Sequence, residues 1–92
     1  MRSVSIFGAT GSIGESTYDL MLHAGGAQAF RTVALTGGRN VVRLAQMARE
    51  LRAELAVTAY DDCLPALREA LAGTGIAVAA GAAAIAEAAD RP

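Results

Sequence analysis

The sequence of 92 residues contains no lysine, no tryptophan, one cysteine and two prolines. The single cysteine, Cys63, allows no internal disulfide, so we expect a protein of the reducing cytoplasm. We interpret Cys63 as an ordinary small side chain near a helix start. No apolar run reaches the roughly 18 residues that a membrane-spanning helix needs. Gly8 and Thr10 interrupt the first apolar patch, which indicates a strand and a turn rather than a secretory signal.

An excess of charge of one sign is also lacking. Eight basic residues, all of them arginine, stand against nine acidic ones, which gives a net charge of −1. Without a basic stripe there is no electrostatic reason to expect a nucleic-acid partner. The alanine-rich residues 77–89 carry no basic face, so we interpret them as close helix–sheet packing rather than a membrane surface. Because 53% of the residues are hydrophobic, the composition excludes a disordered tail.

Short β-branched runs alternate with helical periodicity along the whole chain. The pattern predicts strands over residues 3–7, 31–36, 55–58 and 76–79, and helices over residues 12–23 and 82–89. Two further helices are expected, one with Asn40 as its N-cap and one capped by Asp61 or Asp62. The apolar stripes expected on the first three helices are Ile13, Thr17, Leu20 and Met21, then Val41, Leu44, Ala45, Ala48 and Leu51, and finally Leu64, Leu67 and Leu71.

Repeated strand–helix units of this kind predict an α/β fold of the Rossmann type, in which helices pack on both faces of a doubly wound parallel sheet. About four strands fall short of the usual six, and Pro92 stands where another strand would be expected. We therefore expect residues 1–92 to be the N-terminal portion of an incomplete nucleotide-binding domain. We expect the isolated chain to be only marginally stable, because a half-sheet exposes an edge.

The glycine loop, residues 8–14, joins the first predicted strand to the first helix with the spacing G-x-x-G-x-x-G. This spacing is a variant of the dinucleotide-binding fingerprint. Gly8 would let the chain turn sharply, Gly11 would let the backbone approach a diphosphate, and Gly14 would let the helix pack closely. The helix start adds unpaired N–H donors and a partial positive charge, which together favour an anion.

Polar side chains near the loop support this interpretation. Thr10 and Ser12 supply hydroxyl donors where phosphate oxygens would lie. Ser12 and Glu15 match the capping box S-x-x-E, and we expect Glu15 to point toward solvent because a carboxylate is unfavourable beside a phosphate. His23, the only histidine, ends the first predicted helix, where a positive charge favours the helix dipole.

The residues after the second predicted strand favour NADP over NAD. An NAD-specific domain carries Asp or Glu about 20 residues past the glycines, but residues 36–40 read Thr-Gly-Gly-Arg-Asn and contain no acid. Arg39 offers a fork of donors that fits a 2′-phosphate, which a carboxylate would repel. Gly37 and Gly38 would let the backbone run beneath the adenosine, and Asn40 would donate to the phosphate while it begins the next helix.

The sequence resembles the opening of the 1-deoxy-D-xylulose 5-phosphate reductoisomerases along its whole length. The resemblance is carried by the glycine loop followed by Glu15-Ser16-Thr17, and by Val33-Ala34-Leu35 leading into Gly38-Arg39-Asn40-Val41. It covers roughly the first quarter of a full-length member. By this resemblance, the cofactor contacts are Thr10, Gly11, Ser12, Ile13, Gly38, Arg39 and Asn40.

The resemblance implies an enzyme that rearranges 1-deoxy-D-xylulose 5-phosphate and reduces the product with NADPH to 2-C-methyl-D-erythritol 4-phosphate, in the non-mevalonate route to isoprenoids. It also implies a divalent metal, Mg²⁺ or Mn²⁺, and a homodimer. The family's metal-binding and catalytic residues lie beyond residue 92. We therefore predict no catalytic and no metal-binding residue here, and we expect this segment alone to be inactive.

Two alternatives remain open from the sequence. Aspartate-semialdehyde dehydrogenases and other small NADP-dependent dehydrogenases also use G-x-T-G-x-x-G loops. A non-catalytic NADP-binding module would also fit, because these residues contain no general acid, nucleophile or metal cluster. Sequence beyond residue 92 would separate these alternatives from the reductoisomerase.

Overall fold

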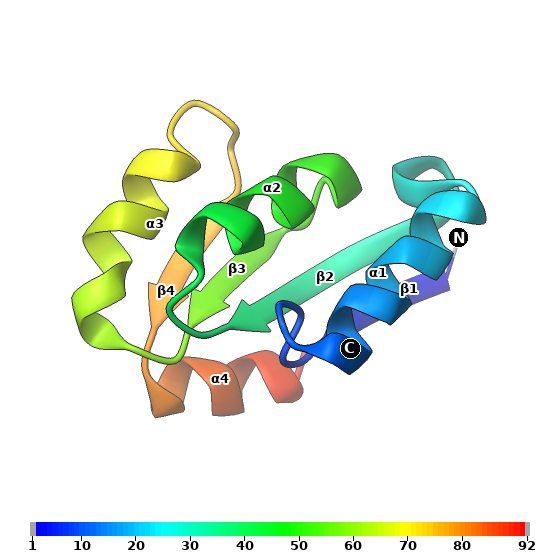
Figure 1. The fold of residues 1–92 in the computed structure, drawn as a ribbon. Coiled ribbons are helices and arrows are strands. Elements are labelled where there is room, and N and C mark those ends of the chain that lie inside the picture. Colours follow the sequence, from blue (N-terminus) through cyan, green and yellow to red (C-terminus); the bar gives the residue numbers. More distant parts are fainter. Residues whose placement is uncertain (1, 92) are drawn as a thin grey trace.

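The computed structural model describes residues 2–91 as a four-stranded sheet with helices on both sides (Figure 1). The strands are β1 (Arg2–Ile6), β2 (Phe30–Gly37), β3 (Leu55–Thr58) and β4 (Ala77–Ala80). The helices are α1 (Ser12–His23), α2 (Val41–Leu51), α3 (Leu64–Ala70) and α4 (Ala82–Ala89), with 3₁₀ turns η1 (Gly26–Gln28) and η2 (Asp61–Cys63). The predicted strands and helices are all present, and the strand ends differ from the prediction by about one residue, as is usual for element boundaries.

All neighbouring strands pair in parallel, in the order β1-β2-β3-β4. Helices α1, α2 and α3 cover one face of the sheet, and α4 lies against the other (Figure 1). The predicted Rossmann-type doubly wound arrangement is thus confirmed. Because every strand runs in the same direction, the loops that follow the strands gather at one edge of the sheet, where open α/β sheets bind their ligands.

The two faces of the sheet have different cores. Leu35 on β2 packs with residues of α1, α2 and α3, and its neighbour Ala34 packs on the opposite side with Ala88 of α4. This alternation follows from the period of two along a strand. The α4 side is built mainly of small side chains, so the alanine-rich segment packs close to the sheet, as predicted. Among the described residues, no helix is long and apolar enough to cross a membrane.

Helix α2 follows its predicted pattern. Its predicted apolar stripe is buried throughout, at Val41, Leu44, Ala45, Ala48 and Leu51. Asn40 is the N-cap, since its side chain accepts a hydrogen bond from the N–H of Arg43 at 3.2 Å. Both the cap and the buried face were therefore predicted correctly.

The stripe predicted for α1 is wrong. Ile13 and Leu20 are 83% and 71% exposed, and the buried residues of the helix are Gly14, Tyr18 and Met21. The predicted stripe and the buried face share only Met21. Each of the other buried residues, Gly14 and Tyr18, follows a predicted residue by one position. Glycine at position 14 lets the helix lie close to the chain beneath it, and this contact selects the face that turns inward.

The predicted aspartate cap of the third helix is also wrong. Asp61 begins the 3₁₀ turn η2, and α3 then begins at Leu64 without any side-chain cap. Pro65 lies in the first helical turn, where its missing N–H has no cost, as expected. Cys63 is the residue just before the helix, and it is half-buried with a free thiol.

Candidate functional site

The glycine loop lies at the junction of β1 and α1 and is bonded to the end of β2. Gly8 adopts a φ of 72°, a conformation that favours glycine, and turns the chain off the strand. Its N–H donates to the hydroxyl oxygen of Thr36 at 2.9 Å, and the N–H of Ala9 donates to the carbonyl of Thr36 at 2.7 Å. Thr36, which the sequence analysis did not single out, therefore holds the loop against the neighbouring strand.

The other two glycines of the loop serve different purposes. A Cβ on Gly14 would stand 2.2 Å from the carbonyl oxygen of Gly8 and 2.5 Å from Cα of Ala9. Such contacts are far inside van der Waals range, so only glycine lets α1 begin against the turn. A Cβ on Gly11 would meet nothing nearer than 3.4 Å. The packing of the chain therefore leaves room for a Cβ at Gly11, in contrast to Gly14.

The amino end of α1 presents free hydrogen-bond donors. Gly11 is the N-cap and has no side chain to bond the first turn. Within residues 2–91, the N–H groups of Ser12, Ile13 and Gly14 donate to no acceptor. These groups add to the positive end of the helix dipole, which is the usual arrangement for binding a phosphate. The predicted capping box of Ser12 and Glu15 is not formed, and of the three residues Ser12 and Ile13 are exposed while Gly14 is buried.

Glu15 does not point into solvent as predicted. Its carboxylate forms a two-point ion pair with Arg43 of α2, at 2.8 Å from Nε and 2.6 Å from Nη2. The hydrogen bonds from Arg43 lower the pKa of Glu15. The Arg43 guanidinium also lies over the Tyr18 ring, 4.8 Å from its centroid. The pair ties α1 to α2 and balances a negative charge that would otherwise stand beside a phosphate site.

Tyr18 completes this link between the two helices. Its ring is buried, and its hydroxyl donates to the carboxylate of Glu50 on α2. Burial and this bond to Glu50 raise the pKa of Tyr18 to about 12. The protonated phenol thus serves as a hydrogen-bond donor that joins α1 to α2.

The arginine turn, residues 37–40, follows β2 and stands beside the glycine loop. A Cβ on Gly37 would come within 3.4 Å of the Thr10 hydroxyl oxygen, so the two loops are in contact. The side chain of Arg39 is 62% exposed, and its Nη1 donates to Asp62 at 3.0 Å. This bond lowers the pKa of Asp62. The predicted cofactor contacts of the glycine loop and of the arginine turn thus lie at the same edge of the sheet. Each of the two loops carries hydrogen-bond donors.

The segment after β3 supports the arginine turn from the other side. The hydroxyl of Thr58 donates to the carbonyl of Gly38 at 3.0 Å, and the N–H of Ala59 donates to the carbonyl of Gly37 at 2.8 Å. The ring of Tyr60 lies under the Arg39 guanidinium, 4.0 Å away. Sequence reasoning missed these residues. The one available signal was a threonine near the end of each of two apolar strands, Thr36 and Thr58.

The donor set fits a dinucleotide that carries an extra phosphate. Free N–H groups at a helix start suit a diphosphate, and a guanidinium such as that of Arg39 suits a further phosphate. No metal site accompanies it, because residues 2–91 contain no cluster of three or more His, Cys, Asp or Glu side chains. The residues on the two loops therefore fit the diphosphate and the extra phosphate of NADPH.

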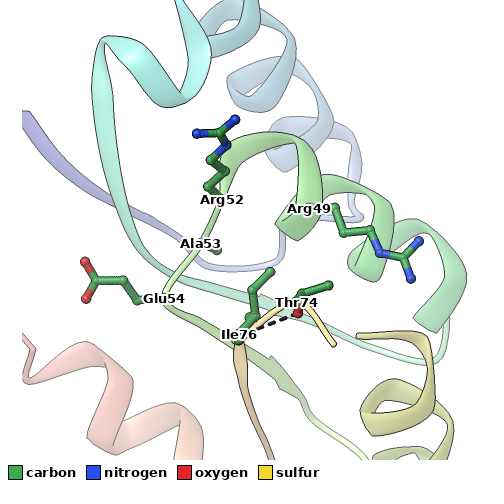
Figure 2. Close-up of a pocket in the computed structure, with 7 residues that line it drawn as sticks. Arg49, Arg52, Ala53, Glu54, Thr74 and Ile76 are labelled. Atoms are coloured by element: carbon green, nitrogen blue, oxygen red, sulfur yellow. Dashed lines mark hydrogen bonds between the residues drawn. The ribbon is translucent and has the colours of Figure 1, made fainter. Parts of the chain in front are cut away.

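A cavity of about 450 Å³ lies at the opposite end of the strands, between residues 52–54 and 74–76 (Figure 2). Three of its polar side chains are already bonded within the chain. Arg49 donates to the carbonyl of Ala70, and Glu54 pairs with Arg31 at 2.5 Å. The Thr74 hydroxyl accepts the N–H of Ile76 at 3.1 Å, the bond that is dashed in Figure 2. This cavity also precedes the strands rather than following them, so it is not the candidate cofactor site.

Comparison with known proteins agrees with this geometry. The sequence model of the 1-deoxy-D-xylulose 5-phosphate reductoisomerase family matches residues 4–92. The reductoisomerase of Cereibacter sphaeroides is 79% identical over the whole chain, which covers 23% of that protein. The enzyme of Paracoccus denitrificans is 68% identical, again over the whole chain and 24% of the relative. The chain thus spans about a quarter of the length of the curated relatives it matches.

Solved structures give the same result. The Zymomonas mobilis reductoisomerase in complex with NADPH superposes with a TM-score of 0.91 at 45% identity, over 96% of this chain and 23% of that one. A second reductoisomerase, in complex with NADPH, fosmidomycin and magnesium, gives a TM-score of 0.87 at 31% identity, over 97% and 22%. By sequence and by fold, the chain belongs to the 1-deoxy-D-xylulose 5-phosphate reductoisomerase family.

Proposed function

We propose that this chain is the NADPH-binding part of a reductoisomerase that converts 1-deoxy-D-xylulose 5-phosphate to 2-C-methyl-D-erythritol 4-phosphate in the non-mevalonate isoprenoid pathway. The observation that carries the cofactor assignment is the row of unbonded N–H groups at the start of α1, with Arg39 on the neighbouring turn. Family membership and the NADPH held by a solved relative support it. An aspartate-semialdehyde type of dehydrogenase is not favoured, because the matching family is a different one.

In this proposal each of the two loops binds a different part of the cofactor. Thr10, Gly11, Ser12 and Ile13 bind the diphosphate, through main-chain N–H groups and the two hydroxyls. Gly38, Arg39 and Asn40 bind the adenosine and its 2′-phosphate. When bound, NADPH supplies the hydride for the reduction step. The residues of this chain hold and orient it.

The remaining parts of the reaction are proposed from the family alone. A divalent metal, Mg²⁺ or Mn²⁺, and the phosphorylated sugar would be bound by residues outside 2–91, since that range holds no metal-binding cluster. A magnesium-bound relative supports the choice of metal. We further propose a homodimer located in the cytoplasm, and we expect residues 1–92 by themselves to form an incomplete, inactive domain.

The cofactor assignment is tested by titrating NADPH and NADH side by side into the protein at its natural full length. Arg39→Glu places a carboxylate where the 2′-phosphate would bind, so we expect a loss of NADPH affinity of about tenfold or more and little change for NADH. Arg52→Glu makes the same charge change at the opposite end of the strands and serves as the matched control. Equal losses for both cofactors in Arg39→Glu would refute the assignment.

A further inference from the structure

The Arg39 guanidinium is oriented by two side chains that follow β3, Tyr60 and Asp62. Its guanidinium stacks on the ring of Tyr60 with 4.0 Å between the guanidinium carbon and the ring centroid. One terminal nitrogen, Nη1, donates to Oδ2 of Asp62 at 3.0 Å. The stack defines the plane of the guanidinium, and the bond to Asp62 defines its rotation within that plane. An exposed arginine without such contacts would sample many rotamers.

The orientation leaves the useful edge of the guanidinium free. Asp62 bonds only to Nη1, and within residues 2–91 the Nε and Nη2 groups of Arg39 have no partner. These two nitrogens form the edge that binds a phosphate with two parallel hydrogen bonds. An ion pair that used this edge would have to break before a phosphate could bind. The observed pair with Asp62 leaves it open.

The Tyr60 ring under Arg39 is itself held by two hydrogen bonds through the Thr58 hydroxyl. The N–H of Tyr60 donates to the hydroxyl oxygen of Thr58 at 3.3 Å, and that hydroxyl donates to the carbonyl of Gly38 at 3.0 Å. The Tyr60 ring also lies against Gly38, where a Cβ would be 3.5 Å from Cε2. The residue that stacks on Arg39 is therefore attached to the same turn that carries Arg39. Their relative positions are set locally.

We propose that Tyr60 is a positioning residue for cofactor choice, one that holds the free edge of Arg39 toward the 2′-phosphate and so raises the preference for NADPH over NADH. This inference rests on the proposed function, because it assumes that Arg39 binds the 2′-phosphate. Tyr60 acts through Arg39, and its hydroxyl has no part in this role. The face of the aromatic ring, on which the Arg39 guanidinium stacks, provides the positioning.

The experiment measures the ratio of the NADH and NADPH dissociation constants by calorimetric titration of the protein at its natural full length. Four variants are compared with the parent: Tyr60→Leu, Tyr60→Phe, Arg39→Met, and the double variant Tyr60→Leu with Arg39→Met. We expect Tyr60→Leu to lower the ratio about two- to fivefold, the range of an exposed cation–π contact. Tyr60→Phe keeps the ring and should keep the ratio. In the Arg39→Met background, Tyr60→Leu should have no effect on the ratio.

The outcomes separate this inference from the proposed function. If Arg39→Met lowers the ratio and Tyr60→Leu does not, the positioning role is wrong and the cofactor assignment stands. If Tyr60→Leu weakens NADPH and NADH equally, Tyr60 has only a structural or adenine-binding role, and the inference is again overturned. If Arg39→Met itself leaves the ratio unchanged, the assignment of Arg39 fails and the inference fails with it. Because Tyr60 is 42% exposed, we expect all variants to fold.

Discussion

The glycine loop and the arginine turn follow adjacent parallel strands and both lead into helices, yet they are built in different ways. In the glycine loop the N-cap is Gly11, and the first turn of α1 has no side-chain cap. In the arginine turn the side chain of Asn40 caps α2, and Arg39 is held by other side chains. In our proposal the glycine loop binds the cofactor mainly through its main chain, and the arginine turn binds it mainly through the side chains of Arg39 and Asn40.

This difference predicts that the two loops contribute differently to the affinity for NADH and NADPH and to the preference between them. Main-chain N–H groups bind any diphosphate, so we expect the glycine loop to bind NADH and NADPH alike. The 2′-phosphate distinguishes the two cofactors, and only the arginine turn carries a side chain suited to it. Changes in the glycine loop should therefore alter affinity for both cofactors. Changes in the arginine turn should alter the preference between them.

The largest effect is expected from Gly14→Ala. The new Cβ would stand 2.2 Å from the main-chain oxygen of Gly8, and both segments are packed, so α1 has to move away from the turn. We expect the free energy of unfolding to fall by about 1–3 kcal/mol, as for overpacked cores, even though alanine is the better helix former. Urea unfolding measures the loss. An unchanged or raised stability would show that α1 does not rely on this close contact.

A pair of variants at Asn40 separates capping from cofactor choice. Asn40→Ala removes the acceptor for the N–H of Arg43 and should cost about 1 kcal/mol of stability. Asn40→Asp keeps an equally good cap, so stability should hold, while the new carboxylate repels the 2′-phosphate and lowers NADPH affinity relative to NADH. Thermal unfolding and parallel titrations check both outcomes. Equal loss of stability in the two variants would contradict the capping role.

The smallest effect is expected from Glu15→Gln, and it depends on pH. The hydrogen bonds from Arg43 lower the pKa of Glu15 in the folded chain below its ordinary value of 4.5. The ion pair therefore stabilises the fold above that ordinary value, and this contribution is lost as the pH falls through the lowered pKa. We expect the parent to be slightly more stable than Glu15→Gln at pH 7 and equal to it in strong acid. A stability difference that does not change with pH would contradict this.

The sequence was sufficient to predict the fold and the two loops because their signals are local. The glycine spacing and the periodicity of α2 depend on residues within one or two turns of each other. Asn40 likewise bonds a neighbour only three residues away. Short-range signals of this kind can be read from the sequence without knowing the packing.

The sequence was insufficient where the deciding contact is distant. The inward face of α1 is selected by Gly14 meeting the Gly8 turn, although Ile13 and Leu20 form an equally regular stripe. Asp62 was expected to cap a helix, but it bonds Arg39, 23 residues away. Neither contact has a local pattern. The marginal stability expected for the isolated chain stays a prediction.

The central claim is that the main chain around Gly11 lies against the diphosphate, and Gly11→Ala tests it most directly. Gly11 has an ordinary φ of −81°, and its Cβ would meet nothing within the chain closer than 3.4 Å, so the fold should be unaffected. We expect NADPH and NADH affinities to fall together, by about ten- to a hundredfold, with only a small drop in the unfolding midpoint because alanine is a weaker N-cap than glycine. Full affinity for both cofactors in this variant would contradict the account.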